Sequence, residues 1–247
     1  MFREKRYKFG NTVFAVKSSV DMLFDPKIEE FACDDEPDYT YNIVFGDCEH
    51  GSSYIPCVRN GNCIDADVNG IDLEKIKLPG FLCGVNAAHL LPEKGAFILH
   101  ASNITVDGEA ILFTAPSGTG KSTQAHYWRD ERGAELVNED RAIVFPKDGM
   151  YYAAGCWAMG SGDVCRNVTA PIRAIVVLSQ GKENVVAKPS SAELLSKIVP
   201  QCSFDDKSIT GRIQIIEAVS KMIDKVNIVS FACRNEKESV SELEKFI

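Results

Sequence analysis

The residues with the clearest chemical meaning form one short segment, Ala115 to Gln124, which reads A-P-S-G-T-G-K-S-T-Q. A small residue, four spacers and then Gly-Lys-Ser is the spacing of a phosphate-binding loop. Gly118 and Gly120 permit backbone angles that turn successive N–H groups towards phosphate oxygens. Lys121 supplies a positive charge for the β and γ phosphates, and Ser122 offers a hydroxyl to Mg²⁺. The segment therefore predicts a site for ATP with Mg²⁺.

The whole loop is assigned to the same role. The predicted nucleotide contacts are Ala115, Pro116, Ser117, Gly118, Thr119, Gly120, Lys121, Ser122 and Thr123. Ala115 stands where the usual pattern has glycine, at the end of an apolar strand. That position needs a small residue and no positive φ, so we expect alanine to fit. The alternative is a Gly-rich turn that leads into a helix with a surface lysine.

Two adjacent carboxylates follow the loop at short range. Glu139 and Asp140 come 18 and 19 residues after Lys121, at the end of a short apolar strand. If that strand lies next to the strand before the loop, it brings both carboxylates beside the phosphates. We expect Ser122, Glu139 and Asp140 to bind Mg²⁺, and one of the two carboxylates to act as general base. A solvated acidic turn is the alternative interpretation.

These motifs together resemble the kinase core of HPr kinase/phosphorylase and, more broadly, the phosphoenolpyruvate carboxykinase superfamily. The likeness is carried by I-L-H-A-S-N-I-T-V-D-G-E-A-I-L-F-T-A-P-S-G-T-G-K-S-T and R-G-A-E-L-V-N-E-D-R-A-I-V, within residues 97–144. That family has a histidine on the strand before the loop, then the loop, then Arg-Gly followed by two acidic residues. The corresponding positions here are His100, Ala115 to Ser122, and Arg132 to Asp140.

The resemblance implies transfer of the γ-phosphate of ATP to a hydroxyl, with Lys121, Glu139, Asp140 and His100 as catalytic residues. Compact HPr-kinase-like proteins imply a serine of a peptide or protein as the acceptor. A kinase of a small hydroxylated metabolite and a non-catalytic nucleotide-binding regulator are the alternatives. The chain departs from the family at Glu139, which replaces an aspartate, and it lacks the later Glu-Ile-Arg-Gly motif. The departure at Glu139 leaves open which carboxylate is the base and which the metal ligand.

Two arginines are candidates for contact with substrate phosphate. Arg141 directly follows the acidic pair, and Arg166 lies in the Gly-rich segment 155–167. Each has a simpler alternative, because Arg141 can balance Asp140 and the segment can be an ordinary connection. His126, in the helix after the loop, is interpreted as a surface or packing residue.

The elements expected around the loop are those of an α/β protein. Strands over 96–102 and 110–115 flank an Asp107-Gly108 turn, and a helix over 121–132 ends at Gly133. Further strands are expected at 134–138, 141–145, 150–154 and 172–178, and helices at 81–91, 191–198, 213–223 and 239–246. The order of strand, loop, helix and strand predicts an α/β core of the carboxykinase type.

The N-terminal part differs from the rest of the chain in its predicted secondary structure. Residues 1–80 are predicted to form a β-rich region that packs on a kinase-like domain at 81–247. Strands are expected at 12–16 and 41–45, where β-branched and aromatic residues are enriched. Asn60-Gly61, between two short alternating runs, predicts a hairpin.

Composition and charge narrow the class of protein. Hydrophobic residues make up 45% and charged residues 25% of the chain, as in ordinary globular domains. The net charge of −8 disfavours general binding to nucleic acid or to anionic membrane. No apolar run approaches the ~18 residues of a membrane span, and the N-terminus lacks a secretory signal, so a cytoplasmic location is expected. Homo-oligomer formation is left open.

The cysteines predict neither a disulfide scaffold nor a clear zinc site. There are nine of them, and no two form a C-x-x-C pair. We expect them to be reduced and mostly buried. A cluster of three thiolates from Cys48, Cys57 and Cys63 is the alternative.

Overall fold

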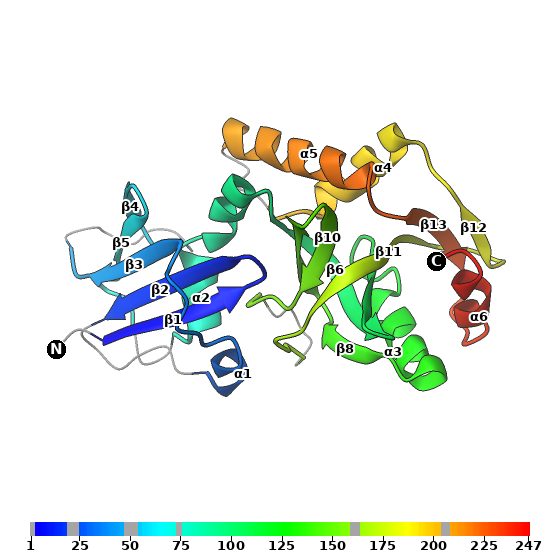
Figure 1. Cartoon of the computed structure of the whole chain (residues 1–247), viewed down its shortest axis with the longest axis horizontal. Helices are drawn as coiled ribbons and strands as arrows, with labels where there is room; N and C mark the ends of the chain where they lie inside the picture. The colour runs from blue at the N-terminus through cyan, green and yellow to red at the C-terminus, as the bar shows by residue number, and fades with distance from the viewer. Residues whose placement is uncertain (1–2, 19–24, 47–53, 73–75, 159–163, 204–207) are drawn as a thin grey trace.

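Two β-sheets organise the molecule, one in the N-terminal part and a larger one in the rest (Figure 1). The computed structural model describes residues 3–18, 25–46, 54–72, 76–158, 164–203 and 208–247. Helices cover both faces of the larger sheet. The mixed α/β class expected from the sequence is therefore confirmed, and its carboxykinase type stays a prediction.

The N-terminal sheet has five strands in the order β1-β2-β3-β5-β4. Their bounds are Arg3–Phe9 (β1), Thr12–Ser18 (β2), Tyr39–Val44 (β3), Cys57–Asn60 (β4) and Cys63–Asp67 (β5). The β1–β2 and β4–β5 pairs are antiparallel, whereas β3 is parallel to both β2 and β5. A short helix, α1 (Pro26–Glu29), lies in the connection from β2 to β3. The predicted hairpin is present as β4–β5, and Gly61 takes a φ of +63° in its turn.

The N-terminal sheet shares its core with later segments of the chain. The Trp157 ring, which follows the larger sheet's strand β10 (Met150–Ala154), lies 5.0 Å edge-on from Phe9 and 5.6 Å from Phe14. Phe81, in helix α2 (Leu78–Gly84), packs edge-on against Tyr41 at 5.7 Å. The domain boundary at residue 80 stays a prediction, and residues from both sides of it contribute to this core.

The prediction of a single helix over residues 81–91 is wrong. The chain forms two helices there, α2 and the 3₁₀ helix η1 (Ala87–Lys94), separated by Asn86 with a φ of +51°. Asparagine enters this left-handed region more readily than most residues. It can therefore separate two helices even though the helical pattern of apolar residues continues across it. Gly95 closes η1 at a φ of +69°, at the predicted stop.

The larger sheet has eight strands in the order β10-β9-β6-β7-β11-β13-β12, with β8 paired to β6. Their remaining bounds are Phe97–Val106 (β6), Glu109–Thr114 (β7), Glu135–Asn138 (β8), Arg141–Lys147 (β9), Thr169–Gln180 (β11), Val185–Ala187 (β12) and Ile228–Cys233 (β13). Strands β7, β11 and β13 are parallel to one another. Strand β10 pairs with both β9 and β11. The five strands β6, β7, β11, β10 and β9 therefore close into a ring.

Successive side chains of β7 point into two different cores, as the pleat of a strand requires. Ile111 and Phe113 pack with helices α3 (Lys121–Arg132) and α6 (Ser239–Glu244). Leu112 packs on the other face, where helices α4 (Ser191–Ile198), η2 (Val199–Gln201) and α5 (Ile209–Ile223) lie. Figure 1 shows α4 and α5 above the sheet, and α3 and α6 below it.

The remaining differences from the sequence expectations are local. Helix α5 begins at Ile209, four residues before the predicted start, and Ser190 caps α4 in a capping box. Strands β1, β12 and β13 have no predicted counterpart. The eight described cysteines are free, but Cys57, Cys63 and Cys83 are exposed, so the expectation of mostly buried thiols is wrong for these three. Cys48 lies outside the described residues.

Within the described ranges, none of the helices is both long enough and apolar enough to cross a membrane.

The Arg59–Glu93 ion pair, which joins β4 to η1, predicts an acid-dependent loss of stability. The Glu93 carboxylate accepts hydrogen bonds from both terminal nitrogens of Arg59, and these bonds lower its pKa below the ordinary value of 4.5. A carboxyl with a lowered pKa stabilises the fold above its unfolded value, and this stability is lost as the pH falls through the lowered pKa. Because both side chains are about one-third exposed, we expect Arg59→Gln to cost about 0.5 kcal/mol at neutral pH.

The measurement is urea unfolding of wild type and variant at a series of pH values. The stability of Arg59→Gln should decline less than that of wild type below pH 4.5. Lys188→Gln is the control, because it removes an exposed positive charge outside this ion pair. Equal acid profiles for wild type and Arg59→Gln would contradict the prediction.

Candidate active site

The predicted phosphate loop connects β7 to α3, at the carboxyl end of a strand that is parallel to β11. Gly118 has a φ of +77°, and Gly120, the N-cap of α3, has a φ of +115°. A Cβ at either position would meet no atom within 4 Å, so their backbone angles, and not crowding, require glycine. Ala115 is buried directly after the strand and has no positive φ, as the sequence predicts.

Lys121 is held at the loop by hydrogen bonds to the loop's own carbonyls. Its Nζ donates to the carbonyl oxygen of Ala115 at 2.9 Å and to that of Pro116 at 3.4 Å. Burial lowers the pKa of Lys121, and the nearby charge of Asp140 opposes this shift. The ammonium group is therefore placed beside the backbone that would carry phosphate, in electrostatic contact with one of the two predicted carboxylates.

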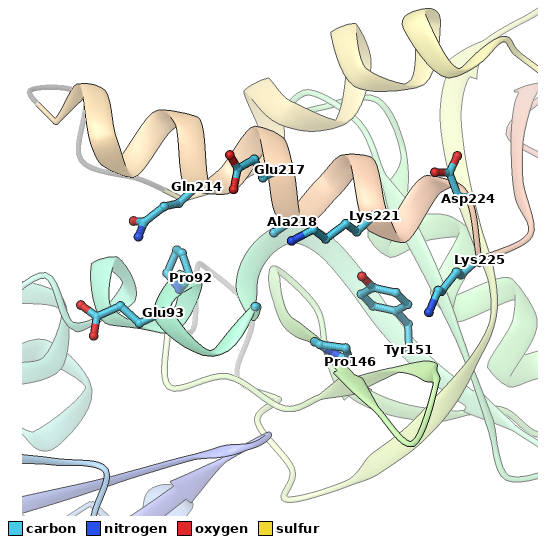
Figure 2. A pocket seen from close by; sticks show the side chains of 11 residues that line it. Pro92, Glu93, Pro146, Tyr151, Gln214, Glu217, Ala218, Lys221, Asp224 and Lys225 are labelled. Carbon is cyan, nitrogen blue, oxygen red and sulfur yellow. The ribbon is translucent and has the colours of Figure 1, made fainter.

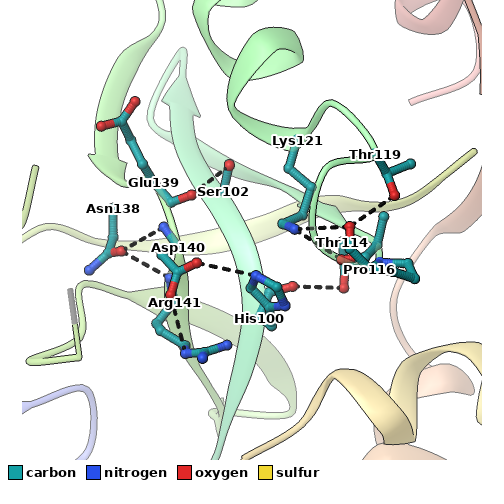
Figure 3. Close-up of polar contacts among 11 residues, drawn as sticks. His100, Ser102, Thr114, Pro116, Thr119, Lys121, Asn138, Glu139, Asp140 and Arg141 are labelled. Atoms are coloured by element: carbon teal, nitrogen blue, oxygen red, sulfur yellow. Dashed lines mark hydrogen bonds and ion pairs between the residues drawn. The ribbon is translucent and has the colours of Figure 1, made fainter. Parts of the chain in front are cut away.

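Asp140 is in contact with two further predicted residues, His100 and Arg141 (Figure 3). Its Oδ1 is 3.2 Å from His100 Nε2, and its Oδ2 is 3.4 Å from Arg141 Nε. His100 comes from β6 and Arg141 begins β9. The structure thus brings together Lys121, Asp140, His100 and Arg141, which the sequence places up to 41 residues apart.

His100 is set up to be neutral. Burial lowers its pKa below 6.5, and the charges of Lys121 and Arg141 lower it further. The charge of Asp140 and a hydrogen bond with Gln201 act in the opposite direction. A neutral imidazole has one nitrogen that donates and one that accepts, so it can orient the Asp140 carboxylate without carrying a charge.

Glu139 points away from Asp140, towards helix α3 (Figure 3). Its Oε1 is 2.6 Å from His126 Nε2. His126 follows Ser122 by four residues, so both side chains lie on one face of α3. The interpretation of His126 as a surface or packing residue therefore missed its contact with the acidic pair. Joint binding of one ion by Glu139 and Asp140 would require Glu139 to leave His126.

The residues at the loop fit Mg²⁺ bound together with phosphate. In the described part of the chain, no three His, Cys, Asp or Glu side chains lie close enough to form a metal site alone. Mg²⁺ does not need such a cluster, because it keeps waters and binds phosphate oxygens along with one or two protein oxygens. The exposed Ser122 hydroxyl in the first turn of α3, and a carboxylate of the acidic pair, supply oxygens of this kind.

The backbone of the acidic pair is fixed from two directions. From β6, Ala101 N donates to Asp140 O at 3.0 Å, and Ser102 Oγ donates to Glu139 O at 2.8 Å. From β8, the buried Asn138 Oδ1 accepts from the backbone N–H groups of Asp140 and Arg141, both at 3.0 Å. Sequence reasoning missed Asn138, although an asparagine that bonds the backbone two residues on is a common turn signal.

The second candidate arginine lies elsewhere. Arg166 Nη2 is 3.1 Å from Glu135 Oε1, and its Nε is 3.9 Å from Glu30 Oε2. These carboxylates hold its guanidinium, and no contact described for Arg166 reaches the phosphate loop. The contact of Arg166 with substrate stays a prediction. Residues 159–163 of the same predicted segment lie outside the described residues.

Cavity volume alone does not identify the candidate active site. A cavity of about 540 Å³ lies between α5, η1 and the β9–β10 turn (Figure 2). Lys221 and Lys225 line it together with Glu217 and Asp224, so charges of both signs face the same space. It contains none of the predicted site residues, and α5 lies on the sheet face opposite to α3.

Comparison with known proteins gives a distant likeness to a solved structure. No family model matches the sequence, and no curated protein matches it. Among solved structures, the chain is similar to the Hpr(Ser) kinase/phosphatase from Coxiella burnetii, with 17% sequence identity and a TM-score of 0.28. The match covers 38% of this chain and 63% of that chain, which is less than two thirds of its length. A likeness at this level indicates only a distant structural relation.

Truncation of the Asn138 side chain is expected to lower the stability of the fold substantially. Its Nδ2 also donates to Cys156 O at 3.0 Å, so Asn138→Ala leaves two partly buried N–H groups and one buried carbonyl without their partner. Because unsatisfied buried groups are costly, we expect the free energy of unfolding to fall by roughly 3 kcal/mol. Urea unfolding measures this change. Asn42→Ala, which removes one exposed bond to Asp65, should cost about 1 kcal/mol or less; similar losses in the two variants would contradict the prediction.

Proposed function

We propose that the protein is a P-loop kinase that binds ATP with Mg²⁺ and transfers the γ-phosphate to a hydroxyl group. The observation that carries the proposal is the arrangement at the predicted phosphate loop, where the Asp140 carboxylate contacts His100 at 3.2 Å and its charge acts on the Lys121 ammonium group. A lysine alone would support nucleotide binding. A carboxylate and a neutral imidazole next to it add a group able to take a proton from an attacking hydroxyl.

The nucleotide-binding roles follow from the loop. The N–H groups around Gly118 and Gly120 and the ammonium group of Lys121 bind phosphate oxygens. Ser122 and Glu139 would hold Mg²⁺, and Glu139 would then have to leave His126. When bound, the ion neutralises negative charge on the phosphates and so lowers the barrier to attack.

The transfer step uses the other carboxylate. The acceptor oxygen attacks the γ-phosphorus as its proton passes to Asp140, and the bond from the γ-phosphorus to the bridging oxygen of ADP breaks. His100 orients Asp140 for this step, and Arg141 faces the same carboxylate. Lys121 stabilises the negative charge that accumulates on the transferred phosphoryl group and on ADP.

The acceptor we propose is a serine of a peptide or protein. Support comes from residues 97–144, whose motifs resemble HPr-kinase-like proteins that phosphorylate serine. The contact between Glu139 and His126 favours a second candidate, a nucleotide-binding regulator without turnover, because it leaves one carboxylate instead of two on the Lys121 side.

Two variants separate these functions. Lys121→Ala should lose ATP binding by about tenfold or more and lose transfer, because the phosphates lose their fixed positive charge. Asp140→Asn should keep ATP binding but lose transfer by roughly a hundredfold or more, because the amide cannot take the proton. ATP binding is measured by calorimetry, and transfer by label from γ-labelled ATP offered with peptide and metabolite fractions of a cell lysate.

Lys188→Ala, at an exposed position outside the site, is the control and should match wild type in both assays. Label in a peptide supports the serine acceptor, whereas label in a small molecule points to a metabolite kinase. Transfer by Asp140→Asn at the wild-type rate would remove Asp140 from the chemistry. ATP binding with no transfer to any fraction would favour the regulator.

A further inference from the structure

A second cavity lies beside the phosphate loop, on the side away from the acidic pair. Its volume is about 390 Å³, within the usual range for small-molecule sites. The residues that line it are Gly118, Thr119, Gly120, Thr123, Gln124, Gln180, Gly181, Cys233 and Asn235. They come from the loop, the first turn of α3, and the carboxyl ends of β11 and β13. In the sheet order, β11 and β13 are on one side of β7, whereas β6 and β9, which carry His100 and Arg141, are on the other.

The cavity is at a topological switch point of the sheet. After β7 the chain passes through α3 and returns in β8, which pairs with β6. After β11 it passes through α4 and α5, on the opposite face, and returns in β13, next to β11. The two connections therefore leave in opposite directions from neighbouring parallel strands. Crevices at the carboxyl ends of such strands are where open α/β sheets bind their ligands.

The lining of the cavity suits an uncharged polar ligand. None of the nine residues that line it is charged. Gln180 and Asn235 present exposed amides, and Thr123 presents a hydroxyl. Gln124 is buried and already bonded to Ser239 Oγ at 3.0 Å, so it forms a fixed wall. Such uncharged groups can form hydrogen bonds with the edge of a nucleobase and with the hydroxyls of a ribose. Phosphates instead bind to cations and N–H groups, which are found in the loop.

We propose that this cavity binds the nucleoside of the nucleotide. The inference rests on the proposed function, because it takes the occupant of the loop to be a nucleotide. The phosphates then run from the cavity across the loop, so that the γ-phosphate ends beside Lys121, Asp140 and His100. It follows that the acceptor hydroxyl arrives from the side of β6 and β9, and that Gln180 and Asn235 contact the nucleoside and not the acceptor.

Filling the cavity tests this arrangement. Gln180→Trp places a large ring in the cavity and leaves the sequence of the loop unchanged, so ADP and ATP should bind about tenfold more weakly or worse. Tripolyphosphate, which needs only the loop, should bind as it does to wild type. Ser179→Trp is the matched control: Val177 and Leu178 pack on opposite faces of β11, so Ser179 lies on the α5 face and Gln180 on the α3 face. Its affinities should equal those of wild type.

A chemical probe gives a second readout that does not depend on a variant. Cys233 lines the cavity, and burial raises the pKa of its thiol, so alkylation is carried out at alkaline pH. ADP should protect Cys233 in wild-type protein, as read by mass spectrometry of its peptide, and tripolyphosphate should not. Cys63, exposed in the N-terminal sheet, is the internal control and should react equally in all samples.

The outcomes separate the two proposals. If neither ADP nor tripolyphosphate binds wild type, the proposed function fails, and this inference with it. If both bind, but Gln180→Trp weakens them equally or not at all, the loop binds phosphate and the nucleoside lies elsewhere. Protection of Cys233 by tripolyphosphate to the same extent as by ADP would overturn the inference in the same way. Selective loss of ADP and ATP binding, with selective protection by ADP, supports it.

Discussion

The hydrogen bonds of β6 hold the two halves of the candidate site together. On one side, β6 pairs with β7, which leads into the phosphate loop, and Thr114 Oγ1 donates to His100 O at 3.0 Å. On the other side, it pairs with β8 and β9 and fixes the backbone of the acidic pair between them. Because β6 also carries His100, one strand sets the positions of the loop, the acidic pair and the imidazole.

The bend between β8 and β9 orients the two carboxylates of the acidic pair differently. Glu139 and Asp140 both lie in this bend, where the chain passes from one strand to the next. Asp140 consequently meets His100 on the side of Lys121, and Glu139 meets His126 on α3. Two neighbouring carboxylates thus have different partners, and the proposal of proton transfer for Asp140 and metal binding for Glu139 rests on this difference.

The sequence was sufficient at the loop and turn positions where glycine sets the local backbone conformation. Gly118 and Gly120 indicate a loop with positive φ, and both have it. Helix α3 begins and ends where Lys121 and Gly133 predict, because a glycine cap acts on the turn next to it. The Asp107-Gly108 turn is also as predicted, with positive φ at both residues. Local signals failed at Asn86, whose left-handed conformation splits a helix that the apolar pattern reads as continuous.

What the sequence determined by itself is which reactive groups are present: a glycine-rich loop with the spacing of a phosphate-binding loop, a histidine on the preceding strand and two carboxylates shortly after. Only the tertiary structure decided their partners. The Glu139–His126 contact, the Asn138 bonds beneath the acidic pair and the cavity formed with the ends of β11 and β13 all depend on strand order and on which way each side chain points. Residue types fix which groups can react, whereas long-range pairing fixes which of them meet.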